Sequence, residues 1–498
     1  MKRVSSVFYI TAALILIAVL LGAFFPIEAE RITTDLNAFL SRTFGWYYMW
    51  IMLGFIAVSV FIAFSPYGKI RLGKDKERPE FSTPTWIAML FSAGLGIGLV
   101  FYGAAEPLLH SFSEAPLSEP GTDQAIKEGL MFSLFHYGLH GWAMYGLVVL
   151  CLAFFQFRKG EPGLISSTLK PLFGDRMKGP LGKAIDVLAT FATIFGVATS
   201  LGLGAAQINA GLEHLFGLET NFATQFIIIA IITVLFLISA WSGLSKGIKY
   251  LSNTNMALAV LLFVSLLFIG PTLLILDLFT ESFGYYLQNI IQMSFRTAPL
   301  GTDNRGWLDA WTIFYWAWWI SWSPFVGMFI ARVSRGRTIR EFMTGVMIAP
   351  TVLCGIWFST FGTTAIGVQQ SGVDLTQYAI EVMNFHMFAN LPFSFLLSLI
   401  SILLILTFFI TSADSATFVL GIQTTKGSLN PAKSVKIVWG LALSSVAIVL
   451  LYVGGLTALQ NTVIAVALPF SFIVILMAIS LLKGLHTELR SMKKRKKV

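Results

Sequence analysis

The sequence predicts an all-α integral membrane protein with about twelve transmembrane helices. Of its 498 residues, 56% are hydrophobic and only 12% are charged, whereas about a quarter of the residues in an ordinary soluble domain carry a charge. The chain contains many apolar runs of the length that a membrane-spanning helix needs, about 20 residues. The basic residues, which give a net charge of +9, lie between these runs. Their placement explains the positive charge without nucleic acid as a partner.

The apolar runs are distributed along the whole chain. The first, from Val7 to Phe25, is long enough to span and is not followed by a cleavage site of small residues, so we expect it to remain in the mature protein. Cys151 and Cys354 lie inside apolar runs and are too few for a disulfide framework or a zinc cluster. The runs begin near Val7, Phe44, Thr85, Leu130, Ala184, Phe222, Leu251, Leu308, Phe342, Leu391, Val435 and Leu459.

Charges in the connecting loops predict the orientation of the chain. With these spans, about 29 of the 34 lysine and arginine residues fall on the side that holds both termini and about 5 on the other side. By the positive-inside rule, both ends then face the cytoplasm. Basic clusters at 69–78 and 332–340 share that side. The opposite side carries an acidic loop from 106 to 128, with Glu106, Glu114, Glu119, Asp123 and Glu128.

One apolar segment is predicted to lie along the membrane and not to cross it. Between Phe279 and Phe295, apolar residues recur at helical spacing beside polar ones, as in an amphipathic helix at an interface. We expect this helix to brace the outer surface. No Pro-rich or Ser-rich linker separates parts of the chain, so residues 1–498 are predicted to form a single transmembrane domain.

Three alternating glycines interrupt the third span, at Gly94, Gly96 and Gly98. Glycines weaken a helix, and in hydrocarbon the freed backbone groups must find partners or line a cavity. One interpretation is an unwound segment whose carbonyls bind a cation, followed by a half-helix that faces an anionic group. The other is close helix packing through Gly94 and Gly98. Both stay open on this segment alone.

Aromatic residues form a stripe in the eighth span. Its members recur at i, i+3, i+4 and i+7, so they share one helical face. A second aromatic group in the fourth span falls within roughly 140° of arc and could close a box with the stripe. Such boxes suit quaternary ammonium groups, with about 0.5 to 2 kcal/mol from each ring; core packing is the alternative. The stripe is Tyr315, Trp318, Trp319 and Trp322, and the second group is Tyr137, Trp142 and Tyr145.

The tenth span combines hydroxyl groups with an acid. Thr411 and Ser412, with a nearby carbonyl, offer the neutral oxygen ligands that a hard monovalent cation needs; the alternative is that they bond back to their own helix. Asp414 is the acid most clearly placed within a span, and such residues are functional by default. For Asp414 we favour a gating or structural role near the cytoplasmic end.

Two further polar patterns have ordinary interpretations. His136 and His140 are four residues apart and could share a metal, but no third ligand is evident in the sequence, so polar contacts at the outer end of the fourth span are expected. The basic run Lys493–Lys497 is expected to act as an orientation signal that contacts anionic lipids. A regulatory role for this tail is the alternative.

Together, the glycine segment, the tryptophan-rich run from Trp311 to Trp322 with the following Ser323–Arg332, and the Thr411–Ser412 pair resemble the betaine/choline/carnitine transporter family over nearly the whole chain. The resemblance implies a homotrimer that works by alternating access and a LeuT-type core of two inverted five-helix repeats. The parts would be two N-terminal helices (1–84), a first repeat (85–275), an outer amphipathic connector (276–307), a second repeat (308–482) and a basic cytoplasmic tail (483–498).

The resemblance also implies which residues bind substrate and ion. The aromatic box would be Tyr137, Trp142, Tyr145 and Trp319, with Trp322 and Phe325 along the substrate route and the glycines Gly94, Gly96 and Gly98 beside it. The coupling ion would be sodium, held by carbonyls of Ser92, Leu95 and Phe408 and by the hydroxyls of Thr411 and Ser412. Tyr137 stands where tryptophan is expected in sodium-coupled betaine members.

Two departures bear on stoichiometry and substrate. A second sodium site in such members uses two threonines of the fifth span, where this chain has Thr193 but Val197. Choline-selective members tend to carry aspartate at the position of Gly98. A carboxylate there would neutralise choline but repel the carboxylate of betaine, so glycine favours betaine.

The function that follows is secondary active import of glycine betaine, or a related quaternary ammonium solute, by sodium symport. We expect this to serve osmoprotection in a bacterial plasma membrane, with no cofactor other than the coupling sodium ion. The alternatives are a choline or carnitine carrier of the same family and a passive facilitator or channel. An enzyme is not expected, because the spans hold no nucleophile, base and orienting group in a recognisable pattern.

Overall fold

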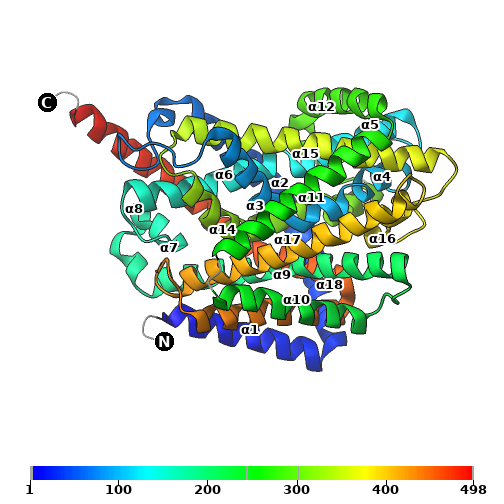
Figure 1. The fold of residues 1–498 in the computed structure, drawn as a ribbon. Coiled ribbons are helices and arrows are strands. Elements are labelled where there is room, and N and C mark those ends of the chain that lie inside the picture. The colour runs from blue at the N-terminus through cyan, green and yellow to red at the C-terminus, as the bar shows by residue number, and fades with distance from the viewer. Residues whose placement is uncertain (1–3, 243–244, 301, 496–498) are drawn as a thin grey trace.

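The computed structural model describes residues 4–242, 245–300 and 302–495, and within these only the helical backbone for residues 91–95, 242, 245–249, 302–304 and 495. Regular structure in this part of the chain is helical apart from a β-bridge between Arg71 and Thr338. The longer elements, drawn in Figure 1, are α1 (Ser6–Phe24), α2 (Pro26–Phe64), α3 (Thr83–Tyr102), α4 (Ala105–Phe112), α5 (Asp123–Tyr137), α6 (Leu139–Ala153), α9 (Pro180–Phe216), α10 (Phe222–Ser242), α11 (Ser245–Ile269), α12 (Thr272–Ser294), α14 (Phe314–Val333), α15 (Ile339–Gln370), α16 (Ile380–Ala389), α17 (Ser394–Thr424) and α18 (Lys433–Arg495).

Short helical elements join these helices. They are η1 (Pro66–Lys69), the π-helical turn η2 (Phe154–Arg158), α7 (Ile165–Thr168), α8 (Lys170–Phe173), η3 (Gly174–Lys178), α13 (Thr302–Trp307) and the π-helical turn η4 (Leu308–Ile313). The turn η4 leads directly into α14. The chain therefore enters the aromatic stripe through a widened helical turn.

The predicted membrane class is confirmed. Nine of the described helices are long and apolar enough to cross a membrane. Nine of the twelve predicted starting points fall within them, and two of these, Val435 and Leu459, both lie in α18. Leu391 lies just before Ser394–Thr424, and the remaining two starting points correspond to α3 and to η4 with α14. The exact number of crossings stays a prediction. The nine helices are Ser6–Phe24, Pro26–Phe64, Asp123–Arg158, Pro180–Phe216, Phe222–Trp241, Tyr250–Ile269, Ile339–Gln370, Ser394–Thr424 and Lys433–Lys494.

Helix α18 is too long for one crossing. Its 63 residues would extend about 95 Å at 1.5 Å per residue, three times the hydrocarbon thickness. It is interrupted at Gly454 and Gly455, the latter with φ +58°, a conformation that favours glycine. In Figure 1 both termini lie at the same end of the helices, which fits an even number of crossings.

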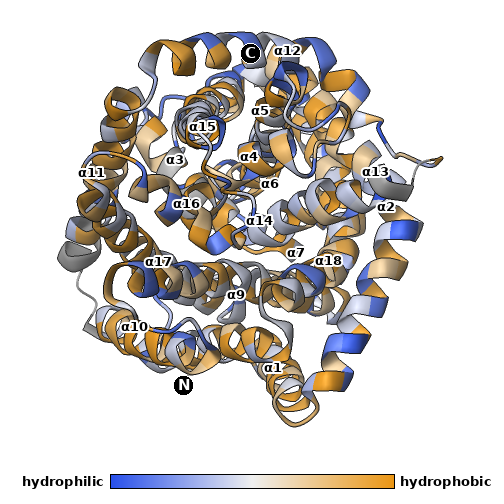
Figure 2. Ribbon diagram, turned by 90° about the vertical axis from the view of Figure 1, so that its right-hand side faces the viewer, coloured by the Kyte–Doolittle hydropathy of each residue, from blue (hydrophilic) through white to orange (hydrophobic). Residues whose placement is uncertain are grey.

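Peripheral helices turn large apolar side chains outward. Phe24 is 73% exposed on α1, Trp241 54% on α10 and Phe268 73% on α11. Figure 2 shows α1, α10 and α11 as largely hydrophobic ribbons at the rim of the molecule. An apolar surface of this extent is expected where lipid, and not water, surrounds the protein.

Helix α9 runs through the interior, packed against α14, α17 and α18. It comes close to α14 at Gly196, where a Cβ would lie 3.0 Å from the carbonyl carbon of Ser321. A small residue at this crossing lets the two backbones approach each other. The crossing holds the aromatic stripe of α14 near the centre of the bundle.

Helix α12 contains the predicted amphipathic segment. In Figure 2 it runs along the upper edge of the molecule, where α15 is seen nearly end-on. Tyr286 is buried while Leu287 is 50% exposed, so the apolar face is narrower than the spacing predicts. The hydroxyl of Tyr286 accepts a hydrogen bond of 3.0 Å from the amide of Leu139, at the break between α5 and α6. The helix therefore braces the hinge that follows Tyr137.

An ion-pair network fixes the C-terminal helix at the end of the molecule that carries both termini. Glu488 of α18 accepts hydrogen bonds of 2.9 and 3.1 Å from the guanidinium of Arg158 and also pairs with Lys159. Arg158 contacts Asp75 at 2.5 Å and donates to the carbonyl of Gly73 at 2.8 Å. The side chains of Arg158 and Glu488 are each 5% exposed, so this pair is buried and tightly held.

Candidate functional site

Helix α3 is broken at Gly96. Its backbone has φ +45° and ψ −142° there, which is a conformation that residues with a Cβ avoid. The helical backbone continues on both sides, with Gly94 in the portion for which side chains lie outside the description. The predicted interruption of this span is therefore confirmed and is located at the middle glycine.

Gly98 supports the other interpretation of the glycine segment, which is close packing against neighbouring helices. A Cβ at this position would lie 2.7 Å from Cη2 of Trp318 and 3.2 Å from the hydroxyl oxygen of Tyr137. The same hydroxyl donates a hydrogen bond of 3.2 Å to the carbonyl of Gly98. The glycine segment thus combines a break at Gly96 with close packing against aromatic side chains at Gly98.

The buried carbonyls at the end of α3 are satisfied by side chains from other helices. Besides Tyr137 on Gly98, the indole of Trp357 donates to Leu99 at 3.0 Å, and the amide of Asn384 donates to Val100 at 2.6 Å. The last carbonyls of a helix lack partners within it, and in hydrocarbon they must be paired with protein groups. Donors from α5, α15 and α16 therefore hold this end of α3 in place.

The aromatic stripe of α14 is buried, and its rings pack face to face. Trp319 stacks on Trp318 at 5.2 Å and on Tyr315 at 5.7 Å between centroids. Its indole N–H donates to the carbonyl of His136 at 2.9 Å. Trp322 contacts Phe325 edge to face at 5.3 Å. All five predicted ring positions of this helix are therefore interior.

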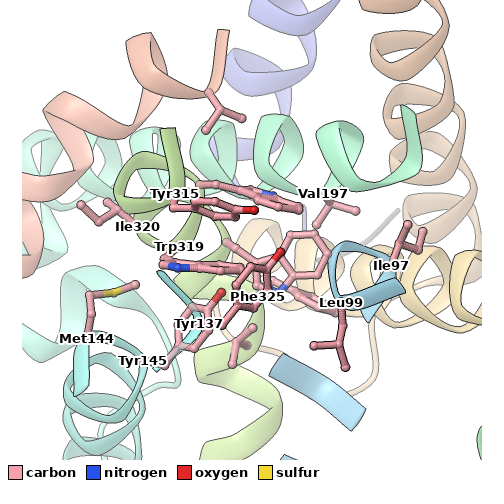
Figure 3. Packing of buried hydrophobic residues seen from close by; sticks show 14 of the residues in the cluster. Ile97, Leu99, Tyr137, Met144, Tyr145, Val197, Tyr315, Trp319, Ile320 and Phe325 are labelled. Atoms are coloured by element: carbon pink, nitrogen blue, oxygen red, sulfur yellow. The ribbon is translucent and has the colours of Figure 1, made fainter. Parts of the chain in front are cut away.

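Tyrosines of the fourth predicted span close around Trp319. Tyr137 and Tyr145 meet it edge to face at 5.1 and 5.9 Å, and Figure 3 shows them on the side of Trp319 opposite Tyr315. Trp142 is different: within the described residues its one ring contact is with Tyr145, at 5.7 Å. Its indole N–H instead donates to the carbonyl of Tyr137 at 3.1 Å. Tyr315 packs against Trp319 as well. We refer to the following residues as the aromatic cluster: Tyr137, Tyr145, Tyr315, Trp318, Trp319 and Trp322.

Several donors in the aromatic cluster have no acceptor. Among the described residues, the indole N–H groups of Trp318 and Trp322 and the hydroxyl of Tyr145 are buried and form no hydrogen bond. Leaving a buried donor unpaired costs about 1 to 3 kcal/mol, so each such group requires an explanation. These three donors are free to meet an acceptor that enters the cluster.

The predicted ion ligands on α17 lie beside the break in α3. The hydroxyl of Ser412 is 4.0 Å from the position of a Cβ on Gly96. Thr411 donates to the carbonyls of Thr407 and Phe408 at 2.9 and 3.2 Å and accepts from the amide of Asn255 at 2.9 Å. Thr411 therefore bonds to carbonyls of its own helix, as the alternative interpretation of this pair predicts.

The remaining predicted ligands fall in the portion of α3 described only as backbone. Ser92 and Leu95 belong to residues 91–95, and their distances to Thr411 and Ser412 lie outside the described residues. Asn255 was missed in the sequence. Its side-chain oxygen is buried without a partner among the described residues. The signal available was its place at the end of the polar stretch Ser252–Asn255, directly before an apolar run.

A second sodium site would draw on Thr193 and on the position of Val197. The hydroxyl of Thr193 donates to the carbonyl of Ala189 at 2.8 Å and accepts from the amide of Gln423 at 3.3 Å. Val197, at the partner position, is fully buried. Valine has no oxygen in its side chain, which weighs against a second ion at this position.

Asp414 is buried, and its carboxylate accepts a hydrogen bond of 2.9 Å from Ser239 of α10. This contact joins α17 to α10. It fits the structural role that we favour for this residue.

His136 and His140 point to different partners. His140 lies 2.8 Å from the hydroxyl of Ser294, whereas His136 lies 2.6 Å from the carboxylate of Glu106. The two histidines therefore make separate polar contacts.

The prediction of an exterior acidic loop is wrong for two of its acidic residues, which lie buried in helices. Glu106 is fully buried in α4, and Glu128 is 3% exposed in α5. Both accept hydrogen bonds from side chains, Glu128 from Gln124 and Glu106 from Tyr315. The available signal for Glu106 was its setting between Gly-Ala-Ala and Pro-Leu-Leu, which is apolar on both sides.

Comparison with known proteins identifies the family. A family model described as the betaine/carnitine/choline family transporter matches residues 6–490. The chain belongs to the betaine/carnitine/choline transporter family. It is accordingly a multi-pass membrane transporter and not an enzyme.

Individual members of the betaine/carnitine/choline transporter family match over almost the full chain. The glycine betaine transporter OpuD of Bacillus subtilis is 56% identical over 499 residues, which cover 100% of this chain and 98% of that protein. An ectoine/hydroxyectoine transporter of Virgibacillus pantothenticus is 42% identical, covering 95% of each chain. A glycine betaine transporter of Acinetobacter baylyi is 41% identical, covering 97% of this chain and 73% of that protein.

Proposed function

We propose that this protein imports glycine betaine, or a closely related quaternary ammonium solute, by sodium symport. The observation that carries the proposal is the aromatic cluster, in which stacked rings and unpaired hydrogen-bond donors share one buried volume. A zwitterionic substrate carries one charged group that suits the rings and another that suits the donors. Its trimethylammonium group suits the rings, and its carboxylate suits the donors.

The rings account for the cationic end. Tyr137 of α5 and Tyr145 of α6 each meet Trp319 of α14 with ring centroids less than 6 Å apart. A desolvated quaternary ammonium gains about 0.5 to 2 kcal/mol from each ring that it contacts. Because the rings touch one another, substrate entry requires them to separate, as expected for a site that opens and closes in alternating access.

The unpaired donors account for the anionic end. Trp318, Trp322 and Tyr145 each have a buried N–H or O–H without an acceptor among the described residues. A carboxylate oxygen accepts hydrogen bonds from such groups, and charge-assisted bonds are about twice as strong as neutral ones. Choline offers these donors one neutral hydroxyl oxygen in place of a carboxylate, and this favours betaine over choline.

The neighbourhood of Gly96 supports sodium as the coupling ion. Ser412 faces the break in α3, and Thr411 keeps one lone pair after accepting from Asn255. One sodium ion that moves through about 100 mV and a tenfold gradient releases roughly 3.7 kcal/mol, enough for several-hundred-fold accumulation of a neutral solute. A single ion site therefore suffices for osmoprotection.

The relatives support the same substrate class. Two of the relatives are glycine betaine transporters, and a third is an ectoine/hydroxyectoine transporter. By extension we propose a bacterial plasma-membrane location with both termini cytoplasmic, a homotrimer, and a core of two inverted repeats at 85–275 and 308–482. Contact of the exposed Lys493 and Lys494 with anionic lipid is proposed for the tail.

Direct binding tests the substrate. The purified full-length chain is titrated with glycine betaine, ectoine, carnitine and choline while tryptophan fluorescence is followed. We expect saturable binding with betaine strongest and choline at least tenfold weaker, since choline has a single neutral hydroxyl oxygen where betaine has a carboxylate. Tighter binding of choline or carnitine would assign the chain to the alternative carrier, and uptake that does not saturate would indicate a channel.

A further inference from the structure

A buried carboxylate lies at one end of the aromatic cluster. Glu106 of α4 is within 2.6 Å of Nδ1 of His136 and 2.5 Å of the hydroxyl of Tyr315. His110, one turn along α4, places Nε2 3.5 Å from the same carboxylate. All four side chains are fully buried. Glu106 is thus hydrogen-bonded to His136 and Tyr315, while Nε2 of His110 lies near it without a hydrogen-bond partner among the described residues.

The hydrogen-bond partners assign the protons. The indole N–H of Trp307 can only donate, and it donates to Nδ1 of His110 at 3.1 Å. Neutral His110 therefore carries its proton on Nε2, which faces Glu106. The Thr312 hydroxyl, 2.9 Å from Nε2 of His136, can donate and so leave the proton of His136 on Nδ1, also facing Glu106.

This protonation pattern favours a charged Glu106 over a metal ligand set. One N–H group and one O–H group that donate to the same carboxylate, with the N–H of His110 3.5 Å away, form an arrangement that stabilises its ionised form. The ligand atoms of Glu106, His110 and His136 lie within 4.8 Å of one another, but a protonated Nε2 on His110 offers no lone pair to a metal ion. We therefore treat the group as a stabilised anion.

Within the described residues, no lysine or arginine forms an ion pair with Glu106. Arg296 approaches the cluster through aromatic rings, with its guanidinium carbon 5.1 Å from the centroid of Trp307 and 5.7 Å from that of Phe132. A buried carboxylate without a cationic partner is costly, and such residues inside membrane proteins mark function. A cationic ligand would compensate for it.

Tyr315 connects this charge to the aromatic cluster. Its ring stacks on His136 at 4.8 Å and on Trp319 at 5.7 Å, and meets Tyr137 at 5.1 Å. By donating its proton toward a carboxylate, the phenol becomes more electron-rich, since hydrogen bonds polarise the groups that they join. The ring face is then a better partner for a cation.

The opposite end of the aromatic stripe offers a hydrogen-bond donor that suits an anionic group. Trp322 lies seven residues after Tyr315 on α14, about 10 Å along the helix, and its indole N–H is unpaired among the described residues. We propose that Glu106 fixes the orientation of a zwitterionic substrate, with the ammonium toward Tyr315 and the carboxylate toward Trp322. Glu106 is then a specificity-determining residue that selects for positive charge without touching the substrate. This assignment rests on the proposed function.

An isosteric pair of ligands tests the charge. In 3,3-dimethylbutyrate a carbon atom replaces the quaternary nitrogen of betaine, so shape and carboxylate remain while the cation is lost. Binding of both to the full-length chain is measured by tryptophan fluorescence. We expect Glu106→Gln to reduce the preference for betaine over 3,3-dimethylbutyrate by about tenfold, the size of one unscreened charge interaction in a partly polar interior.

The control is Glu128→Gln, because Glu128 is also a buried glutamate but is held by Ser118 and Gln124, away from the aromatic cluster. It should leave the preference unchanged. If Glu106→Gln weakens both ligands equally, or leaves their ratio intact, the charge role is overturned. If Glu106→Gln does not fold, Tyr315→Phe removes the hydrogen bond and keeps the ring, and it must lower the same ratio. Absence of betaine binding to the unaltered chain would instead overturn the proposed function.

Discussion

The hydroxyl of Tyr137 donates a hydrogen bond of 3.2 Å to the carbonyl oxygen of Gly98. This bond joins the aromatic residues of α5 to the broken helix α3, two features that are 39 residues apart in the sequence. The glycine at 98 permits it, since a Cβ there would approach both the Tyr137 hydroxyl and Trp318 within 3.2 Å. Helix α3 therefore packs directly against the aromatic cluster.

A substitution at Gly98 should separate the effects of volume and charge. Gly98→Ala is expected to lower uptake of betaine and choline alike, because its Cβ must displace Trp318. Gly98→Asp adds a carboxylate that repels betaine and pairs with choline. We expect the choline-to-betaine uptake ratio to rise at least tenfold in Gly98→Asp relative to Gly98→Ala. Equal ratios in the two variants would contradict the placement of the substrate beside Gly98.

Removal of the central ring should weaken betaine binding. Trp319→Ala takes away the ring that contacts Tyr137, Tyr145 and Tyr315 and lets water into the aromatic cluster, so we expect affinity to fall tenfold or more. Trp319→Phe should be milder. The matched control is Trp316→Ala on the same helix, whose indole stacks on His140 at 5.1 Å and should leave affinity unchanged. Fluorescence titration that gives equal losses for Trp319→Ala and Trp316→Ala would indicate a packing role.

The hydroxyls beside the break in α3 should control the sodium dependence. Replacing both Thr411 and Ser412 by alanine is expected to raise the sodium concentration for half-maximal uptake by roughly tenfold, with each lost ligand costing about 1 kcal/mol. Thr407→Ala is the control, because its hydroxyl bonds only to carbonyls of its own helix, Leu403 and Leu404. An unchanged sodium dependence in the folded double variant would remove these residues from the ion site.

The ion pair between Arg158 and Glu488 should contribute to stability. Arg158→Ala leaves a buried carboxylate without its main partner, a change that typically costs about 3 to 5 kcal/mol. Lys178→Ala, which removes an exposed partner of Asp175, should not change stability measurably. Thermal unfolding of the purified variants in detergent checks this. Equal midpoints for Arg158→Ala and the parent would show that the network does not hold α18.

Local sequence patterns predicted the membrane class and the broken third span. The length of an apolar run determines whether a helix can span the membrane. Glycine at position 96 allows a backbone conformation that residues with a Cβ avoid. The aromatic stripe followed from helical spacing on α14. Each of these properties depends on a single segment, so the sequence of that segment is enough to predict it.

Features that depend on several helices were not predictable in the same way. Glu106 looked like an exterior acid, but its donors come from His136 and Tyr315, which lie 30 and 209 residues away. Trp142 has the spacing of a box residue, yet its indole N–H bonds to the backbone carbonyl of Tyr137. Helical spacing determines which face a side chain occupies and not which neighbour completes its hydrogen bonds.

Transport in proteoliposomes tests the central claim most directly. The full-length chain is reconstituted, and radiolabelled glycine betaine uptake and charge movement are measured with and without an inward sodium gradient. We predict accumulation against the betaine gradient only when sodium is present, with close to one charge moved per betaine, because Val197 offers no side-chain oxygen for a second ion. Betaine uptake that merely equilibrates, with or without sodium, would contradict the account.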